Sequence, residues 1–157
     1  MGRKGWLRGM ICLGLVGLDQ WTKQLALTHL TSPRSLLPGV LGLHLAWNTG
    51  GAFSLPLGGA LAAGILSLTM LALGGWLMMR LVRGRWLHAA MILIASGGVG
   101  NAVDRFLRGA VVDMIRMEWI TFPIFNVADI YVTTGAALLI LSLITAPQEW
   151  KERPHGK

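Results

Sequence analysis

The sequence predicts an all-α membrane protein of four transmembrane helices, with a small β-sheet on its outer side. The chain of 157 residues is 54% hydrophobic and 13% charged, with a mean hydropathy of +0.58, whereas soluble domains usually carry about 25% charged residues. Its apolar residues gather in runs long enough for helical spans of about 20 residues. Its basic residues gather at the ends of those runs. The length suits one integral membrane domain, 1–157.

Three of the four helices have centres without Asp, Glu, Lys or Arg, and they are expected at about 58–80, 86–104 and 128–147. The first helix, expected at about 7–27, is different because Asp19 and Lys23 interrupt it. A basic start before a short apolar run is also typical of a cleavable signal peptide. No small-x-small cleavage site follows, so we favour a retained first helix.

The distribution of basic residues predicts the orientation in the membrane. Of the 14 Lys and Arg residues, nine lie on the side of the two termini, four lie on the other side, and Lys23 lies within the first helix. Short loops rich in Lys and Arg stay in the cytoplasm. We therefore expect both termini in the cytoplasm and the segments 28–57 and 105–127 on the extracytoplasmic side.

The same composition argues against several other classes of protein. The net charge of +7 is not gathered on one polar face, as it would be in a nucleic-acid-binding protein. The single cysteine, Cys12, allows no internal disulfide, and the four histidines show no spacing typical of a zinc protease, so we expect no metal and no cofactor. The glycines of 97–101 lack a nucleotide-binding pattern and more simply allow close helix packing.

The first outer segment contains a short stretch that is typical of a strand. Residues 41–47 alternate partly between apolar and other side chains, and the turn-prone residues 48–51 follow. Strand edges cannot face bare lipid, so this sheet should lie at the membrane interface or against protein.

Asp113 and Asp129 are the best candidates for catalysis, because they lie at either end of the polar stretch between the last two apolar runs. Two neighbouring carboxylates share a proton, so that one acts as general base on water and the other as general acid. Aspartic proteases work in this way without a metal. The alternative is that both are solvated charges at helix ends, with Asp129 as the N-cap of the last helix.

Other polar residues have both a supporting and a functional interpretation. Asp19 and Lys23 are four residues apart, so they either neutralise each other or anchor the outer loops and contact substrate. Asn101, Asp104 and Arg105 either mark the end of the third helix or, for Asn101 and Arg105, orient the two aspartates or hold a substrate carbonyl. Asn126 could donate a hydrogen bond to Asp129, and Asn48 fits a simple turn.

The sequence also resembles a known family, the bacterial lipoprotein signal peptidases (signal peptidase II). Five motifs carry the resemblance in order over nearly the whole chain: Asp19-Gln20-Trp21-Thr22-Lys23, Asn48-Thr49-Gly50-Gly51-Ala52-Phe53, Gly97-Gly98-Val99-Gly100-Asn101-Ala102-Val103-Asp104-Arg105, Val111-Val112-Asp113 and Phe122-Pro123-Ile124-Phe125-Asn126-Val127-Ala128-Asp129. Gly51 stands where the family more often has alanine, and the spacing from Asp113 to Asp129 is short.

The resemblance implies an aspartyl endopeptidase of the bacterial cytoplasmic (inner) membrane, active on the extracytoplasmic side. Such enzymes remove the signal peptide of prolipoproteins by cutting before a diacylglyceryl-modified cysteine. It further implies a loop or short helix over the active site, contact with membrane lipids and inhibition by globomycin, and we expect a monomer. The family's catalytic aspartates fall on Asp113 and Asp129, and its other motif residues fall on Asp19, Lys23, Asn48, Gly50, Asn101, Arg105, Asn126 and Ala128.

Three other functions compete with this interpretation. A small transporter or channel should carry charges within several spans, and the second and fourth have none at their centres. An anchoring subunit without chemistry would not need the clustered polar motifs. A different intramembrane aspartyl protease should contain a Gly-x-Gly-Asp phrase, which this sequence lacks.

Overall fold

The computed structural model describes residues 3–50, 59–81 and 85–145. In chain order it contains α1 (Arg3–His29), β1 (Arg34–Leu37), β2 (Leu41–Asn48), α2 (Ala60–Leu81), α3 (Arg85–Arg108), β3 (Val111–Met117) and α4 (Val127–Thr145). Helices therefore occupy the four ranges in which the sequence predicts them. The expected helix limits at residues 58 and 147 lie outside the described residues.

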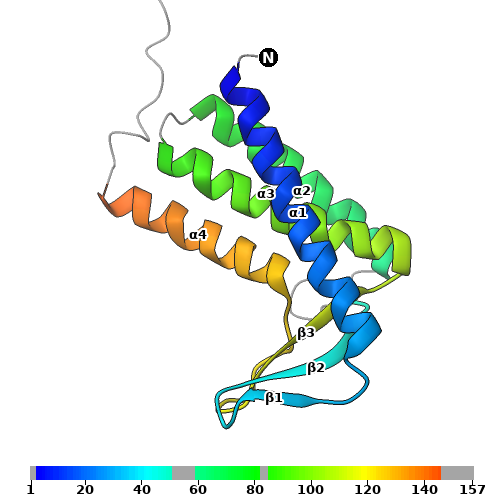
Figure 1. The fold of residues 1–157 in the computed structure, drawn as a ribbon. Helices are drawn as coiled ribbons and strands as arrows, with labels where there is room; N and C mark the ends of the chain where they lie inside the picture. Colours follow the sequence, from blue (N-terminus) through cyan, green and yellow to red (C-terminus); the bar gives the residue numbers. More distant parts are fainter. Residues whose placement is uncertain (1–2, 51–58, 82–84, 146–157) are drawn as a thin grey trace, which may run out of the picture.

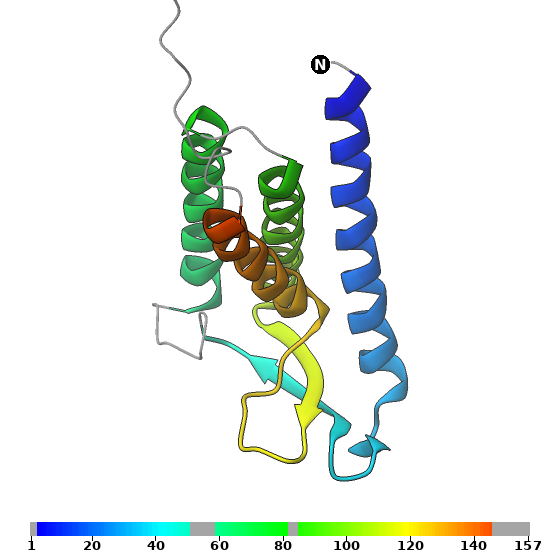
Figure 2. The same cartoon turned by 90° about the vertical axis from the view of Figure 1, so that its left-hand side faces the viewer.

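The helices form a bundle arranged around α3, which packs against each of the other three (Figures 1 and 2). Glycines allow α3 and α4 to approach each other closely. A Cβ atom added to Gly135 would lie 2.8 Å from the carbonyl oxygen of Ala90. One added to Gly97 would collide with the backbone of Ala128. The expectation that the glycines of 97–101 serve close helix packing is confirmed at Gly97.

The sheet has three antiparallel strands in the order β1-β2-β3, and it lies at one end of the bundle (Figure 2). The predicted strand at 41–47 is confirmed as β2. A tight turn joins β1 to β2, and Gly39 adopts a φ of +73° there, which favours glycine. In the register of β2 with β3, Ala46 lies opposite Asp113.

The segment between β3 and α4 folds back along β3. The Phe125 amide donates to the Ile115 carbonyl at 3.0 Å, and the Phe125 carbonyl accepts from the amides of Met114 and Ile115 at 3.0 and 2.8 Å. This pairing brings the start of α4 beside the middle of β3. Outside the helix ends, the described parts of 28–57 and 105–127 form strands and turns, so the expectation of a loop or short helix over the active site stays a prediction. Residues 51–58 lie outside the description.

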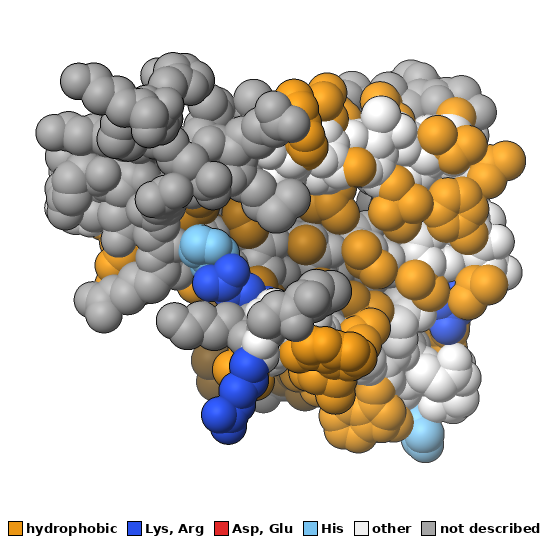
Figure 3. All heavy atoms as spheres, turned by 90° about the horizontal axis from the view of Figure 1, so that it is seen from above, with side chains coloured by type: hydrophobic (Ala, Val, Ile, Leu, Met, Phe, Trp, Pro, Cys, Tyr) orange, Lys and Arg blue, Asp and Glu red, His pale blue; other side chains and the backbone are white. Residues whose placement is uncertain are grey.

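Two of the described helices are long and apolar enough to cross a membrane, Trp86–Arg108 and Val127–Thr145, and Leu61–Trp76 is a shorter apolar helix. Large hydrophobic side chains such as Leu13, Met70 and Ile144 are more than half exposed. Figure 3 views the bundle from the end opposite the sheet, where hydrophobic side chains cover much of the described surface and Lys and Arg are visible. Such a surface suits a lipid environment.

Candidate active site

Asp113 and Asp129 lie close together, and the Asn126 residue joins them. Asp113 lies on β3 and is 3% exposed, while Asp129 lies in the first turn of α4. The Asn126 side-chain amide donates to Asp113 Oδ1 at 2.6 Å. The Asn126 backbone amide donates to Asp129 Oδ2 at 3.1 Å. The two sequence motifs that carry the aspartates therefore meet at one point of the fold.

Asn126 is also the N-cap of α4. Its Oδ1 accepts from the Asp129 amide at 3.0 Å, while the Asp129 carboxylate accepts from the Asn126 amide. This reciprocal pair is a capping box, with the acidic residue three positions after the cap. The alternative that Asp129 itself is the N-cap is therefore wrong, because an Asn three residues earlier holds that position. The expected hydrogen bond from Asn126 to Asp129 is present, but the backbone makes it.

The environment of Asp113 disfavours its charged form. Burial, and next the negative charge of Asp129, raise the pKa of Asp113 from 3.8 to about 6, although hydrogen bonds from Asn126 and Asn48 act in the opposite direction. The alternative of two solvated charges at helix ends therefore fails for Asp113, which is buried on a strand. A carboxyl group with such a pKa can hold a proton close to neutral pH.

Asn101 on α3 connects the aspartates to a buried cation. Its Nδ2 donates to Asp129 Oδ1 at 2.9 Å. Its Oδ1 accepts from Lys23 Nζ at 2.9 Å and from Asn126 Nδ2 at 3.1 Å. Because an ammonium group has only donors, Lys23 fixes the orientation of the Asn101 amide, and the Asn101 NH₂ group must then face Asp129.

Lys23 and Asp19 are both fully buried on α1, and they form an ion pair at 2.9 Å. Asp19 Oδ1 also accepts from the Ala128 amide at 2.9 Å. That amide belongs to the first turn of α4, where the free N–H groups favour a negative charge. Ala128 is fully buried, and its methyl group lies near Gly100, so a larger side chain would not fit. The pair thus anchors α1 to the start of α4.

Asn48, Gly50 and Arg105 form the other side of the site. Asn48 Nδ2 donates to Asp113 Oδ2 at 3.2 Å, and Asn48 Oδ1 accepts from the Gly50 amide at 3.1 Å. Arg105 Nη2 donates to the Gly50 carbonyl at 2.9 Å. Arg105 is 7% exposed, and its Nε has no acceptor in the described part of the chain. Asn48 thus makes a turn, as expected, and also contacts an aspartate.

The ten site residues predicted from the sequence therefore form one connected group. Sequence reasoning missed Gln20 and Arg108, which contact the same buried network through Asp104. Gln20 lies within the first motif, next to Asp19, and this position could have identified it as a site residue. Residues 51–53 of the second motif lie outside the described residues.

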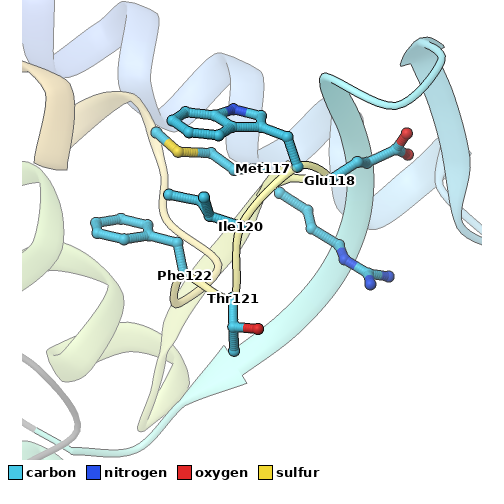
Figure 4. Close-up of a pocket in the computed structure, with 7 residues that line it drawn as sticks. Met117, Glu118, Ile120, Thr121 and Phe122 are labelled. Atoms are coloured by element: carbon cyan, nitrogen blue, oxygen red, sulfur yellow. The ribbon is translucent and has the colours of Figure 1, made fainter.

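A separate pocket lies at the end of β3 and in the segment that follows it, lined by residues 116–122. Met117, Ile120 and Phe122 point to one side of this segment and Glu118 to the other (Figure 4). Glu118 accepts from the Ser35 hydroxyl and the Gly39 amide, which fixes the β1–β2 turn. None of the predicted site residues lines this pocket. Among the described residues, no group of three or more His, Cys, Asp or Glu is placed to hold a metal ion.

Comparison with known proteins decides the family. The model of the family described as signal peptidase (SPase) II matches residues 11–145. The chain belongs to the signal peptidase II family. It is 41% identical over 145 residues to a lipoprotein signal peptidase of Streptococcus thermophilus, covering 89% of this chain and 90% of that protein. It is 35% identical to the lipoprotein signal peptidase of Deinococcus radiodurans, covering 94% of this chain and 84% of the relative.

Solved structures of bacterial membrane enzymes share the fold. One, obtained by the in meso method at 2.3 Å resolution, superposes with a TM-score of 0.80 at 28% identity, covering 96% of this chain and 94% of that chain. A second, at 1.9 Å resolution, gives a TM-score of 0.76 at 29% identity, covering 89% and 94%. The resemblance found in the sequence motifs is therefore confirmed. The protein is a membrane-embedded peptidase, and its helical bundle and small sheet are those of its family.

Proposed function

We infer that this protein removes signal peptides from prolipoproteins, and we propose that Asp113 and Asp129 perform the hydrolysis as an aspartyl dyad. Membership of the signal peptidase II family carries the activity. The observation that best supports the dyad is the Asn126 residue, which binds both aspartates at once. The proposed cleavage site is the bond before a diacylglyceryl-modified cysteine.

In the proposed mechanism Asp113 starts protonated and Asp129 starts ionised. The raised pKa of Asp113 supports this assignment. Asp129 accepts hydrogen bonds from Asn101 and from the Asn126 amide, which hold its carboxylate in place. Asp129 removes a proton from water, which attacks the peptide carbonyl, while Asp113 gives its proton to the carbonyl oxygen. Collapse of the tetrahedral intermediate breaks the C–N bond, and a proton passes from the dyad to the leaving amine.

The remaining site residues hold the dyad and the substrate. Five of them position the dyad, because they contact the aspartates, each other or the start of α4. They are Asn101, Asn126, Lys23, Asp19 and Ala128. Arg105 is the proposed substrate contact. Its buried Nε–H group finds no acceptor among the described residues, and a substrate carbonyl would accept a hydrogen bond from it. Asn48 and Gly50 would hold the adjacent chain in place.

We also propose how the protein lies in the membrane. All four helices would cross the bilayer, with both termini in the cytoplasm and the sheet outside. The Lys and Arg side chains visible at the end opposite the sheet support this orientation (Figure 3). The signal peptide and the diacylglyceryl group would then enter from the surrounding lipid, and only water would have to reach the aspartates. We propose that the enzyme acts as a monomer and binds globomycin at the same site.

A cleavage assay tests the proposal. Purified protein in lipid would be given a diacylglyceryl-modified prolipoprotein or its unmodified form. Wild type should cleave only the modified form, and Asp113→Asn and Asp129→Asn should be folded and inactive. Glu118→Gln makes the same acid-to-amide change outside the dyad and should remain active. Cleavage by either dyad variant at the wild-type rate would refute the roles assigned to the two aspartates.

A further inference from the structure

Asp104, a carboxylate without a role in the mechanism above, lies at the centre of the buried polar network. It is fully buried near the end of α3. Its Oδ2 accepts from Lys23 Nζ at 2.9 Å and from the Val112 amide at 3.1 Å. Its Oδ1 accepts from Gln20 Nε2 at 3.2 Å and from the Arg108 guanidinium. One side chain thereby joins α1, α3 and β3.

The first connection leads to Asp113. The Val112 amide immediately precedes Asp113 on β3, and Asp104 accepts a hydrogen bond from it. Val112 is fully buried, so no water is available to replace this acceptor. Asp104 therefore holds the strand that carries Asp113 at a fixed position relative to α3.

The second connection leads to Asp129. The three N–H donors of Lys23 are matched by three acceptors, on Asp19, Asp104 and Asn101. Asn101 then donates to Asp129. Without the Asp104 carboxylate, the Lys23 ammonium would have one acceptor fewer, and the Asn101 amide that it orients would lose its constraint.

The third connection is electrostatic. Lys23 and Arg108 face Asp19 and Asp104, so this group of four is neutral when all are ionised. Lys23 favours the charged form of Asp113, and the two carboxylates beside Lys23 offset that influence. Among the described residues, the charged groups around the dyad are Asp19 and Lys23 from α1, and Asp104, Arg105 and Arg108 from α3.

We propose that Asp104 is a positioning residue for both catalytic aspartates, acting on Asp113 through the Val112 amide and on Asp129 through Lys23 and Asn101. This proposal rests on the dyad proposed above. Asp104 touches neither aspartate within hydrogen-bond distance, so its substitution acts only through these neighbours and through the charge balance.

The decisive variant is Asp104→Asn. Both carboxylate oxygens accept from two donors, so an amide would turn its NH₂ group toward two of these donors whichever way it lies. A displacement of the dyad of about 1 Å lowers turnover about 100-fold. We therefore expect kcat to fall about 100-fold with KM little changed. The group also gains a positive charge, so both limbs of the kcat/KM pH profile should move to lower pH.

Arg108→Gln is the second variant, and it gives the opposite sign. The Arg108 side chain is 22% exposed, so its replacement strands no buried cation, and it leaves the group with a net negative charge. Both limbs of the pH profile should then move to higher pH. A purely structural role of the network would not move the profile in opposite directions in the two variants. Glu118→Gln should leave kcat and the profile unchanged.

The outcomes separate the two proposals. Wild-type cleavage that is lost in Asp113→Asn upholds the dyad. Given that result, wild-type kcat and an unmoved profile in folded Asp104→Asn would overturn the positioning role alone. If Asp104→Asn does not fold, Arg108→Gln decides: an upward shift supports the role, and an unmoved profile overturns it.

Discussion

Replacing Asp113 with asparagine should abolish cleavage yet stabilise the fold above pH 6. The pKa of Asp113 lies at about 6 instead of 3.8, because burial and the charge of Asp129 disfavour its carboxylate. A folded-state pKa above the unfolded-state value means that protonation stabilises the fold. This contribution is complete below about pH 4 and is lost as the pH rises through 6. An asparagine at this position is neutral at every pH, so the variant would keep this stabilising contribution throughout.

The size of the effect follows from the two pKa values. The difference between 3.8 and about 6, at about 1.4 kcal/mol per pH unit, corresponds to about 3 kcal/mol at pH 8. Asparagine has one carbonyl oxygen, so its NH₂ group must face a donor of Asn126 or Asn48. The lost hydrogen bond costs about 1 kcal/mol. Asp113→Asn should therefore be about 2 kcal/mol more stable than wild type at pH 8, and about 1 kcal/mol less stable at pH 3.

Thermal melting in detergent from pH 3 to pH 8 measures this difference. For a chain of this length, about 2 kcal/mol raises the midpoint by about 4–8 °C at pH 8. The sign should reverse at about pH 4.5, where the ionisation of Asp113 and the lost hydrogen bond have equal and opposite effects. Glu118→Gln, at an exposed carboxylate, should not melt above the wild-type temperature at pH 8. A variant that melts at or below the wild-type temperature at pH 8 would refute the inference that the Asp113 carboxylate is destabilised in the folded state.

Three further predictions concern the buried contacts. Gly100→Ala should lower the free energy of unfolding by about 1–3 kcal/mol, because its Cβ would lie 2.5 Å from Asp19 Oδ2; Gly98→Ala, whose Cβ has ordinary contacts at 3.4 Å, should melt at or slightly above the wild-type temperature. Lys23→Met leaves the buried Asp19 carboxylate without a cation and should destabilise the fold by about 3–5 kcal/mol, measured by denaturant titration. Asn126→Ala should lose activity and at least about 1 kcal/mol from the helix cap alone, so unchanged melting would contradict the capping box.

Much of the fold could be predicted because each signal lies within one segment of sequence. Long apolar runs predicted the helices, and the alternation of residues 41–47 predicted β2. β1 has four exposed residues and no alternation. β3 carries Asp113 and Arg116, and its first four residues are all buried, so period two is absent. These two strands form through pairing with β2, a contact between distant segments that local pattern cannot reveal.

The sequence predicted which residues come together at the site, but it did not predict the contacts between them. Motifs named the residues, whereas the contact between Lys23 and Asn101 joins positions 78 residues apart. Gly50 takes part through its backbone carbonyl, which every residue type has. The sequence predicted a hydrogen bond from Asn126 to Asp129, whereas the Asn126 side-chain NH₂ group donates to Asp113 and its backbone amide donates to the Asp129 carboxylate. The choice between side chain and backbone depends on the pairing of Phe125 with β3, which places the start of α4 beside that strand.

The capping box at the start of α4 has a consequence for inhibitor resistance. The Asp129 carboxylate accepts from the Asn126 amide at the start of α4 and is also the proposed base. A substitution of Asp129 that is selected by an inhibitor of the proposed dyad would therefore loosen the helix end as well as stop the proposed chemistry. Variation that evades an inhibitor should accumulate instead among side chains that only line the substrate path, where neither the helix nor the reaction depends on them.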